Sequence, residues 1–119
     1  MGWSISTGDI KRVSSFAQAE KHWADTAPWK TENQTWRPLG NRRARHKRLV
    51  KLVDGGYACV LYRTAMVTYY PGGSVLLDVH DSMSSRDFSD CMAPAGCRVV
   101  SHQGCMYWKV NTPQGAHYY

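Results

Sequence analysis

The sequence predicts an α+β fold in which an N-terminal helix packs on a curved antiparallel sheet, a meander of about five or six short strands. Three observations favour this fold: apolar residues at helical spacing near residue 20, short β-rich runs after residue 44, and glycine-containing turns between those runs. The 119 residues, 43% hydrophobic and 20% charged, suit a single domain with one modest core. We divide it into a helical segment at 1–36, a β-rich body at 37–110 and a tail at 111–119.

The helix is predicted within the stretch SSFAQAEKHWADTAP. Ser14 or Ser15 can cap its first turn, and Ser15 with Gln18 can form a capping box. Pro28 is expected to end the run. Its apolar positions follow helical spacing, and they are Phe16, Ala19, Trp23 and Ala27.

Three hairpins are predicted in the β-rich body. KRLVKLV and YACVLYR flank Asp54-Gly55-Gly56, TAMVTYY and SVLLDVH flank Pro71-Gly72-Gly73, and CRVVS and CMYWKV flank His102-Gln103-Gly104. Consecutive hairpins indicate an antiparallel meander. SSRDFSDCM is expected to form a short helix, and the tail NTPQGAHYY is expected to be irregular.

Positive charge is concentrated in RPLGNRRARHKRLVK, residues 37–51, called the basic segment below. It holds seven Lys or Arg, one His and no acidic residue, whereas the rest of the chain has eight basic and nine acidic residues. The formal net charge of +6 therefore comes from this segment alone. A nearly neutral body with one basic segment indicates a surface that meets a polyanion.

The basic segment is interpreted as part of a strand, although Leu49, Leu52 and Val53 also have the spacing of an arginine-rich helix. On a strand, alternate side chains share a face with a repeat of about 6.6 Å. One face would carry Arg43, Arg45, Lys47 and Lys51. The other face, or the loop margin, would carry Arg42, His46 and Arg48.

A strand of this kind could follow a phosphate backbone, because each guanidinium offers a planar fork to a phosphate. Tyrosines on neighbouring strands could stack on unpaired bases, and His46 would add charge below about pH 6.5. The predicted binding residues are Arg37, Arg42, Arg43, Arg45, His46, Lys47, Arg48, Lys51, Tyr62 and Tyr69. The alternative is a charged edge strand that prevents aggregation, with tyrosines that pack across strands.

Four residues near the C-terminus could supply a tetrahedral zinc site: Cys91, Cys97, His102 and Cys105. Their spacing differs from that of common zinc modules, whose paired ligands lie two to four residues apart. We interpret the cysteines as small buried thiols and expect no cofactor, with zinc as the alternative.

Asp78, His80 and Asp81 lie together at a predicted strand end, where an acid–base pair or a metal site is conceivable. The plainer interpretation is a polar strand end. The sequence has no metalloprotease motif, nucleophile elbow or phosphate loop. A protein without enzymatic activity is therefore expected, and a small metal-dependent hydrolase is the alternative.

The segments quoted above resemble a group of small phage-encoded hypothetical proteins. The likeness covers residues 11–97 and rests on a Trp-containing helix, an RPL basic segment, a T-x-VVTYxPDG hairpin, a Ser-containing segment and a Pro-x-Gly. Here the hairpin reads TAMVTYYPGG, residues 64–73, with Gly72 where the group usually has Asp. The resemblance implies a phage origin and carries no established activity.

Together these points predict a phage accessory protein that acts by binding, in the manner of an anti-CRISPR inhibitor. Its partner would be nucleic acid, RNA or DNA, or a host nucleoprotein or other acidic protein surface, met in the host cytoplasm. No run of 18 apolar residues and no signal peptide is present, so no membrane partner is expected. The alternative is a virion or assembly component that contacts the genome or a neighbouring subunit.

Overall fold

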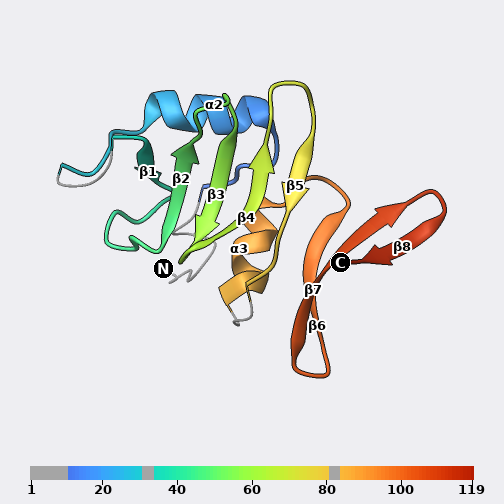
Figure 1. Ribbon diagram of the computed structural model, residues 1–119. Coiled ribbons are helices and arrows are strands. Elements are labelled where there is room, and N and C mark those ends of the chain that lie inside the picture. The colour runs from blue at the N-terminus through green and yellow to red at the C-terminus, as the bar shows by residue number, and fades with distance from the viewer. Residues whose placement is uncertain (1–10, 31–33, 81–83) are drawn as a thin grey trace, which may run out of the picture.

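Two helices and two antiparallel sheets make up the described part of the chain, which is an α+β fold as predicted (Figure 1). The computed structural model describes residues 11–30, 34–80 and 84–119. The helices are α2 (Phe16–Asp25) and α3 (Ser84–Met92). The first sheet is a meander in the order β1 (Trp36–Pro38), β2 (Lys47–Lys51), β3 (Tyr57–Leu61), β4 (Thr64–Tyr69) and β5 (Val75–Leu77). The second sheet consists of β6 (Cys97–His102), β7 (Cys105–Thr112) and β8 (Gly115–Tyr118).

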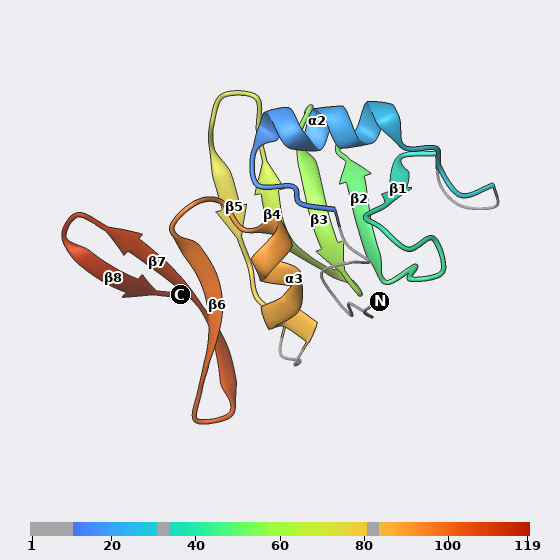
Figure 2. The same cartoon turned by 180° about the vertical axis from the view of Figure 1, so that it is seen from behind.

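Both helices lie on the same side of the five-stranded sheet, as the view from behind shows (Figure 2). Helix α2 contacts β2 and β3, whereas α3 contacts β3 and β6. We call this side the helix face and the other side the opposite face. The three-stranded sheet lies beyond β5, next to α3 (Figures 1 and 2).

Helix α2 begins where the sequence predicts. The Ser15 hydroxyl accepts a hydrogen bond from the Gln18 backbone N–H at 3.2 Å. The Gln18 side chain accepts one in return from the backbone N–H of Ser14 at 2.7 Å, one residue before the cap. These bonds satisfy N–H groups that have no partner inside the helix. The helix is preceded by other residues and is thus not strictly N-terminal.

The main core forms on the helix face. Leu49, Cys59 and Val67 stand in one row across β2, β3 and β4, and all three are fully buried. Helix α2 covers the neighbouring Tyr57, whose ring lies 5.5 Å from that of Phe16 and 6.0 Å from that of Trp23. Burial of each large apolar side chain contributes about 1.5–3 kcal/mol. The helix is thus held mainly by its apolar side.

The second sheet shares this core. Val99 on β6 and Trp108 on β7 belong to the same cluster of buried side chains as the first sheet. The Trp108 indole N–H also donates a hydrogen bond to the backbone carbonyl of Asp78, just after β5. The two sheets are therefore linked by apolar packing and by a side-chain hydrogen bond.

The three predicted hairpins are confirmed, and a further hairpin has no turn signal. At the first, the Asp54 carboxylate accepts from the Gly56 N–H at 3.0 Å. The further hairpin joins β3 to β4 through Tyr62 and Arg63, with Leu61 paired to Thr64. It lacks the Gly, Asn or Pro that usually marks such a turn.

Three expectations need correction. The strands form two sheets, with eight strands described, rather than one sheet of five or six. The tail is not irregular, because the chain turns back before Gly115 and β8 pairs with β7. The strand expected to carry Arg43 to Lys51 begins only at Lys47 and ends at Lys51, so the helix alternative is wrong. Residues before it turn instead, because the Asn41 side chain accepts from the Arg43 N–H at 2.9 Å.

In the described residues, no helix combines the length and the apolar character needed to cross a bilayer.

Candidate functional site

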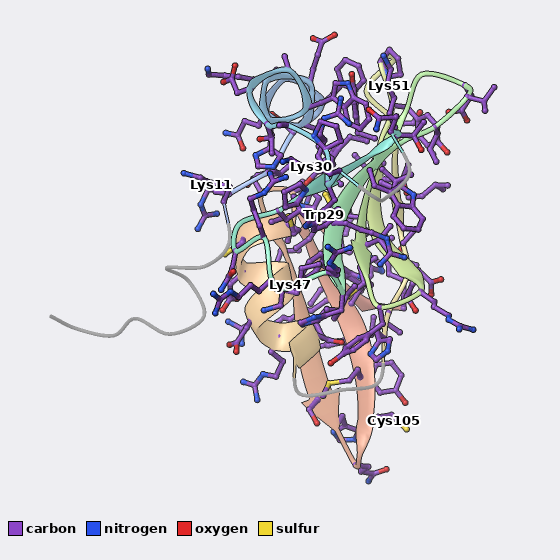
Figure 3. All side chains as sticks on the ribbon, turned by 90° about the vertical axis from the view of Figure 1, so that its left-hand side faces the viewer. Lys11, Trp29, Lys30, Lys47, Lys51 and Cys105 are labelled. Atoms are coloured by element: carbon purple, nitrogen blue, oxygen red, sulfur yellow. The ribbon has the colours of Figure 1, made fainter. Side chains whose placement is uncertain are left out.

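The basic segment does not form one cationic face. Lys47, Leu49 and Lys51 point to the helix face because alternate residues of β2 share a side, and Leu49 is in the core. Arg37 pairs with Leu49 and lies on the same side. Its guanidinium carbon is 3.7 Å from the Trp23 ring centroid. Figure 3 shows Lys47 and Lys51 at different heights along the sheet.

Arg42 holds the connector between α2 and β1. Its guanidinium donates to the backbone carbonyls of Ala27 at 3.0 Å and Pro28 at 2.9 Å. The Trp29 indole donates in turn to the Arg42 carbonyl at 2.8 Å. Arg43 lies in the turn that replaces the start of the expected strand, and it is exposed. Arg42 therefore has a structural role, whatever it contributes to binding.

The remaining basic side chains gather on the opposite face, near the β3–β4 turn. There an open hollow of about 720 Å³ is lined by residues from separate parts of the chain. We call it the basic hollow. Its lining residues are Arg45, His46, Arg48, Tyr62, Arg63, Thr64 and His80. Three arginines thus meet two imidazoles and a phenol.

The aromatic rings of the basic hollow form a stack. The Tyr62 ring centroid is 4.8 Å from that of His46, with 27° between the planes, and 5.0 Å from that of His80, with 22°. His46 precedes β2 and His80 follows β5, so they approach from opposite sides of the β3–β4 hairpin. We call these three rings the His–Tyr–His stack.

Backbone contacts fix the stack at its centre. Tyr62 has φ 59°, a left-handed conformation that is uncommon for a bulky residue. Its N–H donates to the His46 carbonyl at 2.6 Å. His80 is held differently: its carbonyl accepts from the Ser85 hydroxyl, and among the described residues its buried Nδ1 has no hydrogen-bond partner. Stacking on Tyr62 is a contact that orients the His80 imidazole.

The electrostatics of the basic hollow favour an anion. None of its described lining residues is acidic. The ion pair found within the described ranges, Lys21–Asp25, lies on α2. The Arg48 guanidinium donates to the Arg45 backbone carbonyl at 3.2 Å, and its central carbon lies 4.6 Å from the Trp36 ring centroid.

His46 titrates below the range expected from the sequence. Burial lowers the pKa of His46 beneath its ordinary 6.5, and the charge on Lys47 lowers it further. Because the protonated imidazole is disfavoured, the neutral ring dominates at pH 6.5. The predicted gain of charge below about pH 6.5 therefore moves to more acidic conditions.

Tyr69 is not part of this surface. It is 2% exposed, and its hydroxyl donates to the Met92 carbonyl at 2.7 Å. Burial is the main cause that raises the pKa of Tyr69, followed by nearby Cys59 and Cys97. Its row on β4 points to the helix face, which the sequence pattern alone did not distinguish from the opposite face. The prediction that Tyr69 contacts a ligand is not supported by this position.

The four residues considered for zinc are spread along the second sheet and α3. Cys97 pairs with Val110 at one end of the β6–β7 hairpin, and His102 pairs with Cys105 at the other. Cys91 is buried on α3. Within residues 11–30, 34–80 and 84–119, no three His, Cys, Asp or Glu side chains gather as metal ligands. All four cysteines of the chain are free thiols, but the expectation that they are buried holds only for Cys59 and Cys91, because Cys97 is half-buried and Cys105 is exposed.

The contacts of Asp78 and His80 are made with other groups and not with each other. The Asp78 carboxylate accepts from the adjacent Val79 N–H at 2.8 Å, whereas His80 stacks on Tyr62. Asp81 lies outside the described residues. The strand ends at Leu77, earlier than expected, so strand alternation does not place these side chains on one face.

Comparison of the chain with protein-family models, with curated proteins and with solved structures finds no match in any of the three. The site is therefore interpreted from its own geometry.

Sequence reasoning found part of the basic hollow and missed the rest. Arg45, His46, Arg48 and Tyr62 were predicted as binding residues, whereas Arg63 and Thr64 were not, and His80 was considered only for an acid–base pair or a metal site. The feature that sequence reasoning missed is the Tyr62–Arg63 turn, which brings both residues to the end of the sheet beside the basic segment. An unbroken β-rich run from 57 to 70 is too long for one short strand, and that length was the available clue.

Proposed function

We propose that this protein binds nucleic acid through the basic hollow, with the arginines contacting phosphates. The observation that carries the proposal is the convergence of Arg45, Arg48 and Arg63 from two separate segments around aromatic rings. Guanidinium groups form paired, charge-assisted hydrogen bonds with phosphate oxygens, which suits them to this ligand.

The proposal is for binding rather than for an enzymatic reaction. Asp78 and His80, which carried the hydrolase alternative, are engaged in a local backbone contact and in ring stacking. The resemblance to small phage-encoded proteins supplies a setting: in a host cytoplasm the chain would meet nucleic acid alone or inside a nucleoprotein defence complex. An anti-CRISPR-like inhibitor remains the role that this setting favours.

Fluorescence anisotropy with labelled RNA and DNA across a salt series tests the proposal. Affinity should fall with salt, with a log–log slope of about −0.7 for each phosphate contacted on a single strand. Arg63→Ala removes an exposed cation at the turn and should weaken binding and lower the slope by about 0.7. Arg86→Ala on α3 is the matched control, because Arg86 is exposed and does not line the basic hollow.

Two results would count against the proposal. One is the absence of binding to RNA and DNA at low salt, about 50 mM, where contacts with phosphates are strongest. The other is an equal loss of affinity in Arg63→Ala and Arg86→Ala, which would indicate a general charge effect rather than a site.

A further inference from the structure

Three rings from distant parts of the sequence are kept nearly parallel at the surface. The planes of His46 and His80 differ from that of Tyr62 by 27° and 22°, and Tyr62 is 44% exposed. Because almost half of the Tyr62 surface remains in water, its position is not explained by burial in the core.

The backbone at Tyr62 makes this arrangement costly. A φ of 59° crowds the Cβ of any L residue, and glycine would fit the position without that crowding. The chain instead places a large ring there, in a two-residue turn between paired Leu61 and Thr64. Strain of this kind is concentrated at ligand clamps and active sites.

Positively charged side chains line the same hollow as the stack. Arg45, Arg48 and Arg63 line the same hollow, whose volume of about 720 Å³ is within the range of small-ligand sites. A nucleotide joins a flat base to a phosphate, and the basic hollow offers rings and guanidinium groups side by side. Bases stack on aromatic side chains only when their faces are exposed, which a duplex prevents.

We infer that the His–Tyr–His stack is a platform for an unpaired base, so that the basic hollow takes single-stranded nucleic acid in preference to duplex. Because His46 and His80 occupy the two faces of Tyr62, the base would extend the stack from the outer face of one imidazole. This inference rests on the proposed function, since the arginines must first hold the phosphates. The stack then adds affinity that depends on the base and not on the phosphate charge.

The test compares three ligands of equal length, about twelve nucleotides, a typical site size for single-strand binding folds. They are oligothymidylate, the same backbone made of abasic sugar phosphates, and a duplex hairpin. Oligothymidylate should bind at least about fivefold more tightly than the abasic backbone, because that factor is the lower end of what stacking of one base contributes. It should also bind more tightly than the duplex at equal salt.

Variants locate the effect at the stack. Tyr62→Gly removes the ring and suits the left-handed turn, so it should abolish the preference for oligothymidylate over the abasic backbone while salt-dependent binding remains. Tyr62→Phe keeps the ring and should keep the preference. Tyr118→Leu on β8 is the matched control, since Tyr118 is 59% exposed and lies outside the basic hollow.

A measurement on the unmodified protein keeps the inference testable even if a variant fails to fold. The ring resonances of His46 and His80 should shift on addition of oligothymidylate and not on addition of the abasic backbone. Equal, salt-dependent binding of all three ligands would overturn the platform and leave the phosphate-binding proposal intact. Absence of binding to all three would refute both.

Discussion

Replacement of Tyr62 by glycine and by alanine tests whether the turn that carries the stack is strained. Relief of the left-handed conformation by glycine is worth about 1–2 kcal/mol. The greater freedom of glycine in the unfolded chain costs about 0.4–1 kcal/mol. Loss of the two ring contacts costs about 1 kcal/mol in all, at the low end for aromatic pairs. Tyr62→Gly is therefore expected within about 1 kcal/mol of the wild type.

Tyr62→Ala loses the same ring contacts but keeps the Cβ in the left-handed conformation. Alanine should therefore be less stable than glycine here by about 0.5–1 kcal/mol, the reverse of the usual order. Urea unfolding followed by tryptophan fluorescence measures the difference, because the described lining of the basic hollow contains none of the five tryptophans.

Arg63 provides the matched control for this pair of variants. It is the other residue of the same two-residue turn, and it does not have a positive φ. At this position alanine should be at least as stable as glycine. An alanine variant at Tyr62 that equals or exceeds the glycine variant in stability would refute the argument from strain.

Three further predictions concern the scaffold and its titration. Trp108→Phe leaves the Asp78 carbonyl without its indole donor and should lower the free energy of unfolding by about 1–3 kcal/mol. An unchanged midpoint of urea unfolding would show that this hydrogen bond does not stabilise the contact between the sheets. His46 has a lowered pKa in the folded state, so stability should fall as pH drops below about 6.5; His46→Gln should lessen this fall, and equal losses between about pH 7.5 and 5 would contradict it. Ser15→Ala removes the cap of α2 and should cost about 1 kcal/mol, measured by thermal unfolding as a drop of a few degrees; an unchanged midpoint would show that the cap is dispensable.

Local signals predicted the local structure. The start of α2 follows from a serine that can cap it, and the Asp54 turn follows from a side chain that bonds its own backbone. Such interactions lie within a few residues, so the sequence contains everything needed to foresee them. The antiparallel meander follows from these turns in succession.

The division into two sheets and the basic hollow depend on contacts between distant residues. His46, Tyr62 and His80 meet only because β2 to β5 pair in one register, and a shift by one residue would send side chains to the other face. The same uncertainty explains Tyr69, which the sequence pattern allows on either face of β4 and which the structure places in the core. Periodicity shows that a strand has two faces but not which of them is covered by helices.

The split of the basic segment changes how its charge should be tested. Arg37 and Arg42 support the fold, one against the Trp23 ring and the other on two backbone carbonyls. Alanine substitution across the whole segment would therefore lower stability and affinity together, and the two causes could not be separated. Arg63 lies outside the segment, is exposed, and lines the same hollow. A loss of binding in Arg63→Ala at unchanged stability would thus assign affinity to the hollow itself, because no structural contact of α2 or its connector is removed.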